Sequence, residues 1–246
     1  MLSKNQIKYI KSLHNKKERN EEKKFLVEWK KSLIELLHSD FEIEILIISE
    51  SFFVENRNLV SKYSFEILKI EEITKLSTLW TNTDWIALVK QKENSELKNN
   101  WNEIILVLDE IKDPGNLGTI IRIADWYGIN KIIASNNTCE LYNPKVIISS
   151  MGSFTRIKLY YTDLEWYLQN QDFPIYWAFM IWEDIHKTNF EKSWFILIWN
   201  ESNGISKEIE KLVSKKITIP RFWEAESLNA WIATAIILDN VKRPNI

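Results

Sequence analysis

Three polar segments of this 246-residue chain have residue types and spacing that could support chemistry. The first contains Asp113, Pro114, Gly115 and Asn116, and it joins a predicted strand to a predicted helix. Backbone N–H groups in the first turn of that helix, residues 116–119, could bind an anion. Most turns of this kind only connect two elements, and that interpretation stays open.

Arg122 lies six residues after Asn116 on the same predicted helix, between Ile121 and Ile123. An arginine cannot shed its charge, so on a helix packed against a sheet it needs a partner. A structural salt bridge is the simplest explanation. A functional contact is the alternative.

The second segment, residues 199–206, follows another predicted strand. Asn200, Glu201 and Asn203 gather polar groups at the carboxyl end of that strand, which is where open α/β sheets place ligands. The structural alternative is a capping turn in which Ser206 starts the next helix.

The third segment, residues 219–229, also follows a strand and opens an apolar helix. It begins with Ile219 and Pro220 and ends with Ser227, Leu228 and Asn229. Ser227 is well placed to be the N-cap of that helix.

Strands and helices alternate around these segments. Strands are predicted at residues 105–110, 131–134, 157–161, 175–180, 195–198 and 216–219, and helices at 116–128, 144–150, 163–170, 206–213 and 228–242. The first strand is a continuous apolar run, as expected for a strand buried on both faces. This pattern predicts an α/β fold with a parallel sheet.

The first 92 residues predict a smaller α/β domain. Strands are expected at residues 25–27, 42–49, 65–70 and 86–90, with helices at 30–39 and 71–77. Their alternation predicts a largely parallel layer. We expect a substrate-binding domain at 1–92, a polar linker at 93–102 and a catalytic domain at 103–246.

The composition excludes several classes of protein. A lone Cys139 cannot form an intrachain disulfide, and the three histidines show no zinc-ligand spacing. The polar start does not resemble a signal peptide, and no apolar run approaches the ~18 residues of a membrane helix. We therefore expect a soluble, cytoplasmic protein without metal or membrane contact.

The charge is distributed unevenly. Residues 1–31 contain ten Lys or Arg and four Glu, a net charge of +6, whereas the whole chain carries −2. A basic arm of this kind is compatible with binding to a polyanion. A solvated helix face is the alternative.

Taken together and in this order, the three segments resemble the SpoU (TrmH) family of RNA ribose 2'-O-methyltransferases, from about Ile105 to the C-terminus. The shared pattern is N-x-G-x-x-x-R, then N-E-x-x-G-I-S, then I-P before E-S-L-N. The resemblance implies a parallel sheet with a C-terminal trefoil knot (SPOUT-like), an exception to the rule that chains are unknotted. It also implies S-adenosylmethionine as cofactor, rRNA or tRNA as substrate, a homodimer, and a small N-terminal RNA-binding domain.

The resemblance also assigns roles to individual residues. It places Asn116 and Arg122 in the catalytic loop and helix, with Glu201 close to Arg122. Backbone groups at Trp199, Ile219 and Leu228 would hold the cofactor. The side chains expected to shape the catalytic and cofactor site are Ser227 and Asn229.

Methyl transfer to a 2'-hydroxyl requires in-line alignment of oxygen, methyl carbon and sulfur, so positioning should supply much of the rate. A guanidinium with a pKa above ~12 is a poor general base. Our hypothesis is that Arg122 instead clamps an adjacent phosphate and stabilises the developing alkoxide.

Tryptophan stands where the resembling family has glycine, most clearly at Trp199 and Trp223. By looser alignment the same holds for Trp29, Trp177, Trp182 and Trp194. Average usage predicts about 17 glycines, which equals the five glycines and twelve tryptophans together. A glycine at position 199 would let the backbone approach the cofactor closely, whereas an indole there could fill that space. We hypothesise that these positions are UGA codons that the source bacterium reads as glycine; UGG codons at 199 and 223 would refute this.

Two other function classes remain open. A non-catalytic RNA-binding or ribosome-assembly protein could retain the fold without the cofactor site. A nucleotide-binding enzyme could use the turn from Gly115 to Gly118, but no Lys-Ser/Thr pair follows that turn, which argues against a P-loop.

Overall fold

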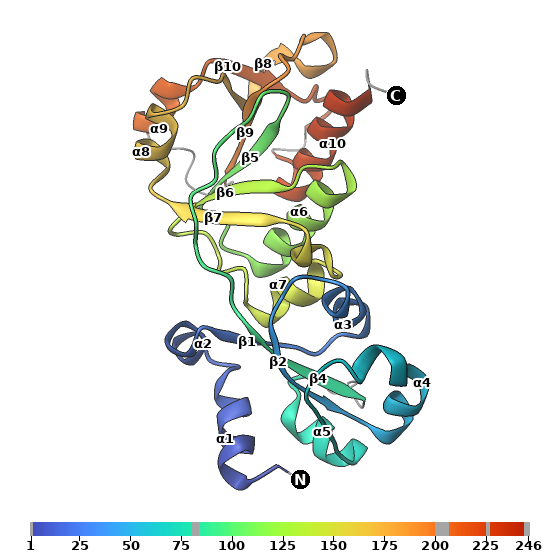
Figure 1. Cartoon of the computed structure of the whole chain (residues 1–246). Helices are drawn as coiled ribbons and strands as arrows, with labels where there is room; N and C mark the ends of the chain where they lie inside the picture. The colour runs from blue at the N-terminus through green and yellow to red at the C-terminus, as the bar shows by residue number, and fades with distance from the viewer. Residues whose placement is uncertain (1, 80–83, 200–206, 225–226, 244–246) are drawn as a thin grey trace. The chain divides into compact units, whose positions relative to one another are not determined.

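The computed structural model describes residues 2–79, 84–199, 207–224 and 227–243, which divide between two units (Figure 1). Unit 1 contains Met1–Glu93 and Tyr142–Thr155, and unit 2 contains Asn94–Leu141 and Arg156–Ile246. The chain therefore leaves unit 2 after residue 141 and returns to it at residue 156. Each unit has its own sheet.

Unit 2 is built on a six-stranded sheet in the order β10-β8-β9-β5-β6-β7, and every neighbouring pair is parallel. The strands are β5 (Ile104–Asp109), β6 (Lys131–Ser135), β7 (Lys158–Thr162), β8 (Ile175–Asp184), β9 (Trp194–Trp199) and β10 (Lys215–Thr218). The central strands are buried on both faces, as the apolar runs predicted. The parallel α/β sheet expected from the sequence is confirmed.

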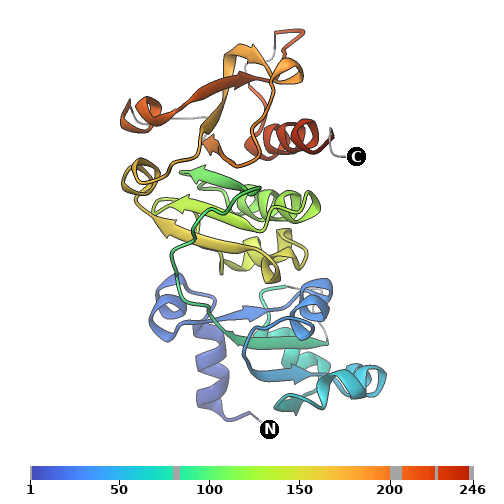
Figure 2. The ribbon, with the colours of Figure 1, turned by 45° about the horizontal axis from the view of Figure 1, so that its top comes forward.

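Helices cover both faces of this sheet. In Figures 1 and 2, α8 (Leu164–Gln169) and α9 (Lys207–Leu212) lie on one side, and α6 (Pro114–Trp126) and α10 (Ala230–Lys242) lie on the other. Leu164, Leu168 and Ile209 pack against Val107 and Leu197 of the sheet. On the opposite side α10 packs along α6. A short 3-10 turn at Ile185–Lys187 follows β8.

Unit 1 has a four-stranded sheet in the order β1-β4-β2-β3. The strands are β1 (Lys24–Val27), β2 (Ile43–Ile48), β3 (Phe65–Ile67) and β4 (Trp85–Lys90), and the helices are α1 (Lys4–Ser12), α2 (Lys16–Glu22), α3 (Lys30–Leu37), α4 (Glu50–Val60), α5 (Ile70–Leu76) and α7 (Pro144–Ser149). Only β2 and β3 pair in parallel, because β4 runs antiparallel to both of its neighbours. The largely parallel layer expected here was wrong: a helix between two strands does not by itself determine the direction of the second.

The connection between β6 and β7 of unit 2 completes the core of unit 1. Tyr142 and Phe154 belong to this connection, and their rings contact the ring of Phe25 at centroid distances of 4.5 and 6.1 Å. The Ser32 hydroxyl donates a hydrogen bond to the backbone oxygen of Ile147 (3.2 Å). Residues 1–92 alone would therefore lack part of this aromatic core.

Gly152, in the same connection, is required by both conformation and space. Its φ is +96°, and a Cβ atom at this position would lie 2.4 Å from Cγ of Glu35. Such a distance is far below van der Waals contact, so any side chain would displace α3 or the loop. This glycine therefore lets the connection approach α3.

We expect Gly152→Ala to reduce the free energy of unfolding by about 2–4 kcal/mol, because left-handed strain and a steric clash add. Urea denaturation measures the loss. Gly128→Ala is the matched control, since Gly128 also has a positive φ (+68°) but open space around its Cβ position. Equal losses for the two variants would contradict the steric argument.

Candidate active site at the carboxyl edge of the parallel sheet

All six strands of unit 2 end at one edge of the sheet, because they are parallel. Asp109 at the end of β5 is in register with Trp199 at the end of β9, and Thr218 of β10 is in register with Asp184 of β8. The three polar segments found in the sequence each follow one of these strands. They therefore start from the same edge, which is where open α/β sheets bind ligands.

The first segment forms the N-terminus of α6. Asp113 is the N-cap, and its carboxylate accepts a hydrogen bond from the backbone N–H of Asn116 (2.9 Å). The anion site considered for this turn is thus partly occupied by the chain's own carboxylate. The Asn116 side chain is half-buried and forms no hydrogen bond with the described part of the chain, so its amide is available to a ligand.

Arg122 is exposed, although its helix packs against the sheet. Leu117, Ile120 and Ile121 form the buried stripe of α6 instead. Arg122 makes no ion pair or hydrogen bond with any residue that the structure describes, so the structural salt bridge is not found there. Its side chain and that of Asn116 project about one third of a turn apart around the helix.

The second segment begins at Trp199, and its polar residues Asn200, Glu201 and Asn203 lie outside the described residues. The expected proximity of Glu201 to Arg122 therefore stays a prediction. The Trp199 indole packs against the apolar cluster beneath α8 and α9, with its ring centroid 5.3 Å from that of Trp177. It consequently lies on the face of the sheet opposite to α6 and Arg122.

The third segment leads from β10 to α10. Ile219 is half-buried directly after β10, whereas Leu228 is 42% exposed and Trp223 is 83% exposed. The N-cap of α10 is Asn229, whose Oδ1 accepts a hydrogen bond from the backbone N–H of Trp231 (3.1 Å). The prediction of Ser227 as N-cap was wrong because the helix begins two residues later, where a carboxamide performs the same function.

Contacts between α6 and α10 bring the first and third segments together. The hydroxyl of Tyr127, directly after α6, donates to Oδ1 of Asp239 near the end of α10 (3.4 Å). Burial and the Asp239 carboxylate raise the pKa of Tyr127. Because the carboxyl ends of these packed helices meet, their amino ends, with Asn116 and Asn229, lie toward the same side.

A polar network at the ends of β5 and β6 was not identified from the sequence. Glu110 has a left-handed φ of +51°, and its N–H donates to Oγ of Ser135 (2.8 Å). Its carboxylate pairs with Lys112 (3.0 Å). Burial raises the pKa of Asp109, while a hydrogen bond with Ser135 opposes that rise. The sequence shows only that Asp109 and Glu110 end a buried strand, and this does not reveal Ser135 as their partner.

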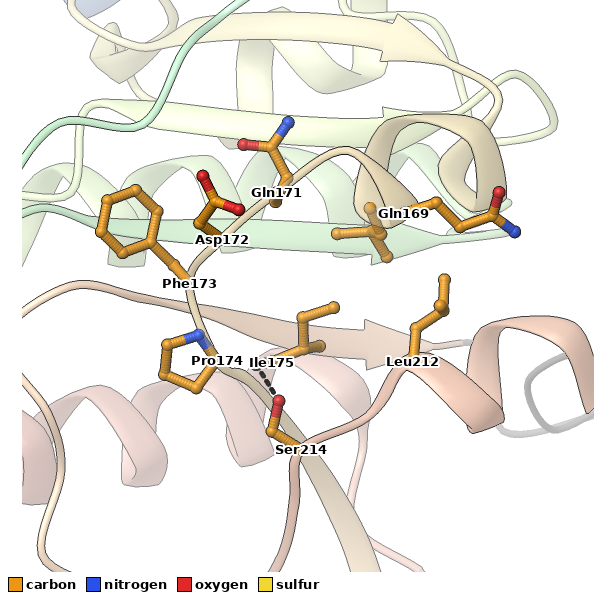
Figure 3. Close-up of a pocket in the computed structure, with 9 residues that line it drawn as sticks. Gln169, Gln171, Asp172, Phe173, Pro174, Ile175, Leu212 and Ser214 are labelled. Carbon is orange, nitrogen blue, oxygen red and sulfur yellow. Dashed lines mark hydrogen bonds between the residues drawn. The ribbon is translucent and has the colours of Figure 1, made fainter.

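A pocket on unit 2 lies away from this edge, at the beginning of β8. Figure 3 shows that Gln171, Asp172, Phe173 and Pro174 line it together with Leu212. Ser214 also lines it and accepts a hydrogen bond from the N–H of Ile175 (3.1 Å). Since it lies at the amino edge of the sheet, it is not part of the candidate active site.

The basic arm of unit 1 is partly used for structure. The Arg19 guanidinium is buried and donates to the backbone oxygens of Leu13 (2.9 Å) and His14 (2.7 Å). Lys24 pairs with Glu44 (2.6 Å). Eight lysines remain exposed to solvent, namely residues 4, 8, 11, 16, 17, 23, 30 and 31. These are the candidate contacts for a polyanion.

Neither a metal site nor a membrane span is found among the described residues. No three His, Cys, Asp or Glu side chains of this part of the chain gather where they could hold an ion. None of its helices combines the length and apolar character needed to cross a bilayer.

Two sequence families match this chain. The SpoU rRNA Methylase family matches residues 103–239, and the MRM3-like substrate binding domain matches residues 4–87. The 23S rRNA (guanosine(2553)-2'-O)-methyltransferase RlmP of Bacillus subtilis is 25% identical over 98% of this chain and 97% of its own length.

Solved structures resemble the whole chain. An RNA methyltransferase of the TrmH family from Porphyromonas gingivalis is 29% identical with a TM-score of 0.88, over 99% of both chains. An AdoMet-bound rRNA methyltransferase from Sinorhizobium meliloti is 25% identical with a TM-score of 0.88, over 100% of this chain and 97% of that one. The expected fold class, a SPOUT-like parallel-sheet methyltransferase domain with a smaller N-terminal α/β domain, is confirmed. The trefoil knot stays a prediction, because residues 200–206 and 225–226 lie outside the described part of the chain. Because the first family covers more than half of the chain, this protein belongs to the SpoU rRNA methylase family.

Proposed function

We propose that this chain is an S-adenosylmethionine-dependent RNA methyltransferase that modifies a ribose 2'-hydroxyl in structured RNA. The observation that carries the proposal is the arrangement at the carboxyl edge. One parallel sheet holds there the Asn116 amide, which has no partner among the described residues, the exposed Arg122 and the start of α10. The relative named for 23S rRNA favours ribosomal RNA over transfer RNA. We place this activity in the cytoplasm.

The residues of the site fit S-adenosylmethionine. The Trp199 indole packs toward α8 and α9, so it does not take up space on the Arg122 side of the sheet. Backbone groups of Trp199, Ile219 and Leu228 would hold the cofactor. When bound, the cofactor supplies a methyl group activated by its sulfonium.

The side chains of this chain would then position the nucleophile. Arg122 can donate two parallel hydrogen bonds to a phosphate next to the target ribose and stabilise negative charge that develops on the 2'-oxygen. Asn116 can donate to the ribose or the phosphate. Asn229 uses Oδ1 to cap α10, which leaves its Nδ2 as a donor toward the site, beside Ser227. Glu201 is proposed to orient Arg122.

Unit 1 is proposed to hold the RNA through its exposed lysines, with residues 1–92 as the substrate-binding domain and 103–246 as the catalytic domain. Lysine ammonium groups neutralise phosphates without reading sequence. Affinity for RNA should therefore fall steeply as salt increases. The 2'-hydroxyl distinguishes RNA from DNA and is also the nucleophile.

We also propose that the enzyme is a homodimer. Trp126 on α6 is 82% exposed and Trp231 on α10 is 36% exposed, and Leu228 lies just before α10. Apolar side chains exposed along two neighbouring helices favour burial against a second copy. Sedimentation of the chain should show a dimer that Trp126→Asp dissociates; a monomer at micromolar concentration would contradict this.

Arg122→Lys should lower kcat for RNA methylation about tenfold to a hundredfold, because one ammonium cannot replace a bidentate guanidinium. Transfer of a radioactive methyl group to RNA measures the rate. The matched control is Arg156→Lys. The Arg156 guanidinium donates to both carboxylate oxygens of Asp125, which lies on α6 as Arg122 does, and Arg156 is assigned no role in the reaction. A near-normal kcat for Arg122→Lys would argue against the clamp.

Calorimetry with S-adenosylmethionine distinguishes the enzyme from a non-catalytic RNA-binding or ribosome-assembly protein. We expect one cofactor per chain for the protein carrying Trp199→Gly and Trp223→Gly, because glycine allows the closest backbone approach. The Trp199 orientation predicts that the unaltered chain binds as well, with weaker affinity. Failure of both proteins to bind would favour the assembly factor.

A further inference from the structure

The turn that follows β5 contains a conformation that is unfavourable for its residue. Glu110 is the first residue after the strand, and its φ of +51° lies in the left-handed region. A residue with a Cβ atom adopts this region only when its surroundings hold it there. Such conformations are concentrated at functional sites.

Ser135, the last residue of the neighbouring strand β6, holds this turn. Its Oγ accepts the hydrogen bond from the Glu110 N–H (2.8 Å) and lies 3.1 Å from Oγ1 of Thr138. Asn137 and Cys139, in the loop that Ser135 begins, reinforce the contact. The Asn137 amide donates to Oε1 of Glu110 (3.1 Å), and the Cys139 N–H donates to the backbone oxygen of Ile111 (2.9 Å).

The turn lies directly before the residues to which we assign the reaction. Asp113, three residues after Glu110, caps α6 and binds the N–H of Asn116. A connection this short transmits any change in the turn to the first turn of α6. The angle at which α6 leaves the sheet also determines where Arg122 lies.

We propose that Ser135 is a positioning residue for methyl transfer: by holding Glu110 in the left-handed conformation, its hydroxyl sets the start of α6 and thereby the places of Asn116 and Arg122. This inference rests on the proposed function. Ser135 does not touch substrate or cofactor in this proposal. It acts through the backbone of the turn.

The same strand offers a matched control at its other end. Asn102 precedes β5, has a φ of +64°, and its N–H donates to Oγ of Ser193 (2.6 Å). A serine hydroxyl therefore holds a left-handed residue at each end of β5. Only the one at the carboxyl edge leads to proposed site residues, so only its loss should affect the reaction.

The test compares Ser135→Ala with Ser193→Ala. Both should lower the thermal midpoint by similar amounts. Ser135→Ala should reduce kcat for RNA methylation about tenfold or more, because small displacements of aligned groups are costly. The calorimetric Kd for S-adenosylmethionine should change less than about twofold in either variant, and Ser193→Ala should retain kcat. Equal kcat in the two variants would overturn the proposal.

A second pair of variants isolates the backbone conformation. Glycine adopts a positive φ without strain, so in a Glu110→Gly background the hydroxyl of Ser135 should be dispensable. We expect Glu110→Gly with and without Ser135→Ala to have the same kcat within about twofold. A continued tenfold loss in the double variant would overturn the proposal, and this comparison holds even if Ser135→Ala alone does not fold.

The rate of RNA methylation by the unaltered chain is measured first. It separates a failure of the proposed function from a failure of the role given to Ser135. An active parent with indistinguishable serine variants overturns only the role of Ser135. A parent that binds S-adenosylmethionine and RNA but transfers no methyl group overturns the proposed function, and the role of Ser135 falls with it.

Discussion

The parallel alignment of the six strands in unit 2 is the constraint on which the candidate site depends. Parallel strands require crossover connections, so every strand ends at the same edge and every connection begins there. This brings helices that are about a hundred positions apart into contact, namely α6, which carries Asn116, and α10, which Asn229 caps. The same alignment buries β5 and β9 on both faces, which gives the site a rigid support.

The connection between β6 and β7 couples the two units through covalent structure. Its residues 142–155 supply Tyr142 and Phe154 to the core of unit 1, while its ends are strands of unit 2. Gly152 is needed there because only its missing side chain allows the approach to Glu35. The two family matches, at residues 4–87 and 103–239, follow one another along the chain. The packed units do not, because residues 142–155 belong to unit 1.

The tryptophans at family glycine positions have different physical consequences. Trp199 packs against Trp177 inside an apolar cluster, so replacing it by glycine would remove buried contacts. Trp223 is mostly exposed and contributes little packing. The hypothesis that all of these positions are UGA codons for glycine must also explain why some of the indoles fit the core. Trp194, for example, has no exposed surface.

The sequence by itself determined the strand and helix order of unit 2, the family, and the three segments that begin at the sheet edge, because apolar periodicity and polar motifs are local signals. It did not reveal α4, whose apolar residues follow no clear period and whose backbone kinks at Asn56. Nor did it reveal the direction of β4, the replacement of Ser227 by Asn229 as N-cap, or the burial of Arg19. The hydrogen bond from the Glu110 N–H to Ser135 Oγ also depends on tertiary structure alone. Strand pairing brings together these two residues, which are 25 positions apart and share no local sequence pattern.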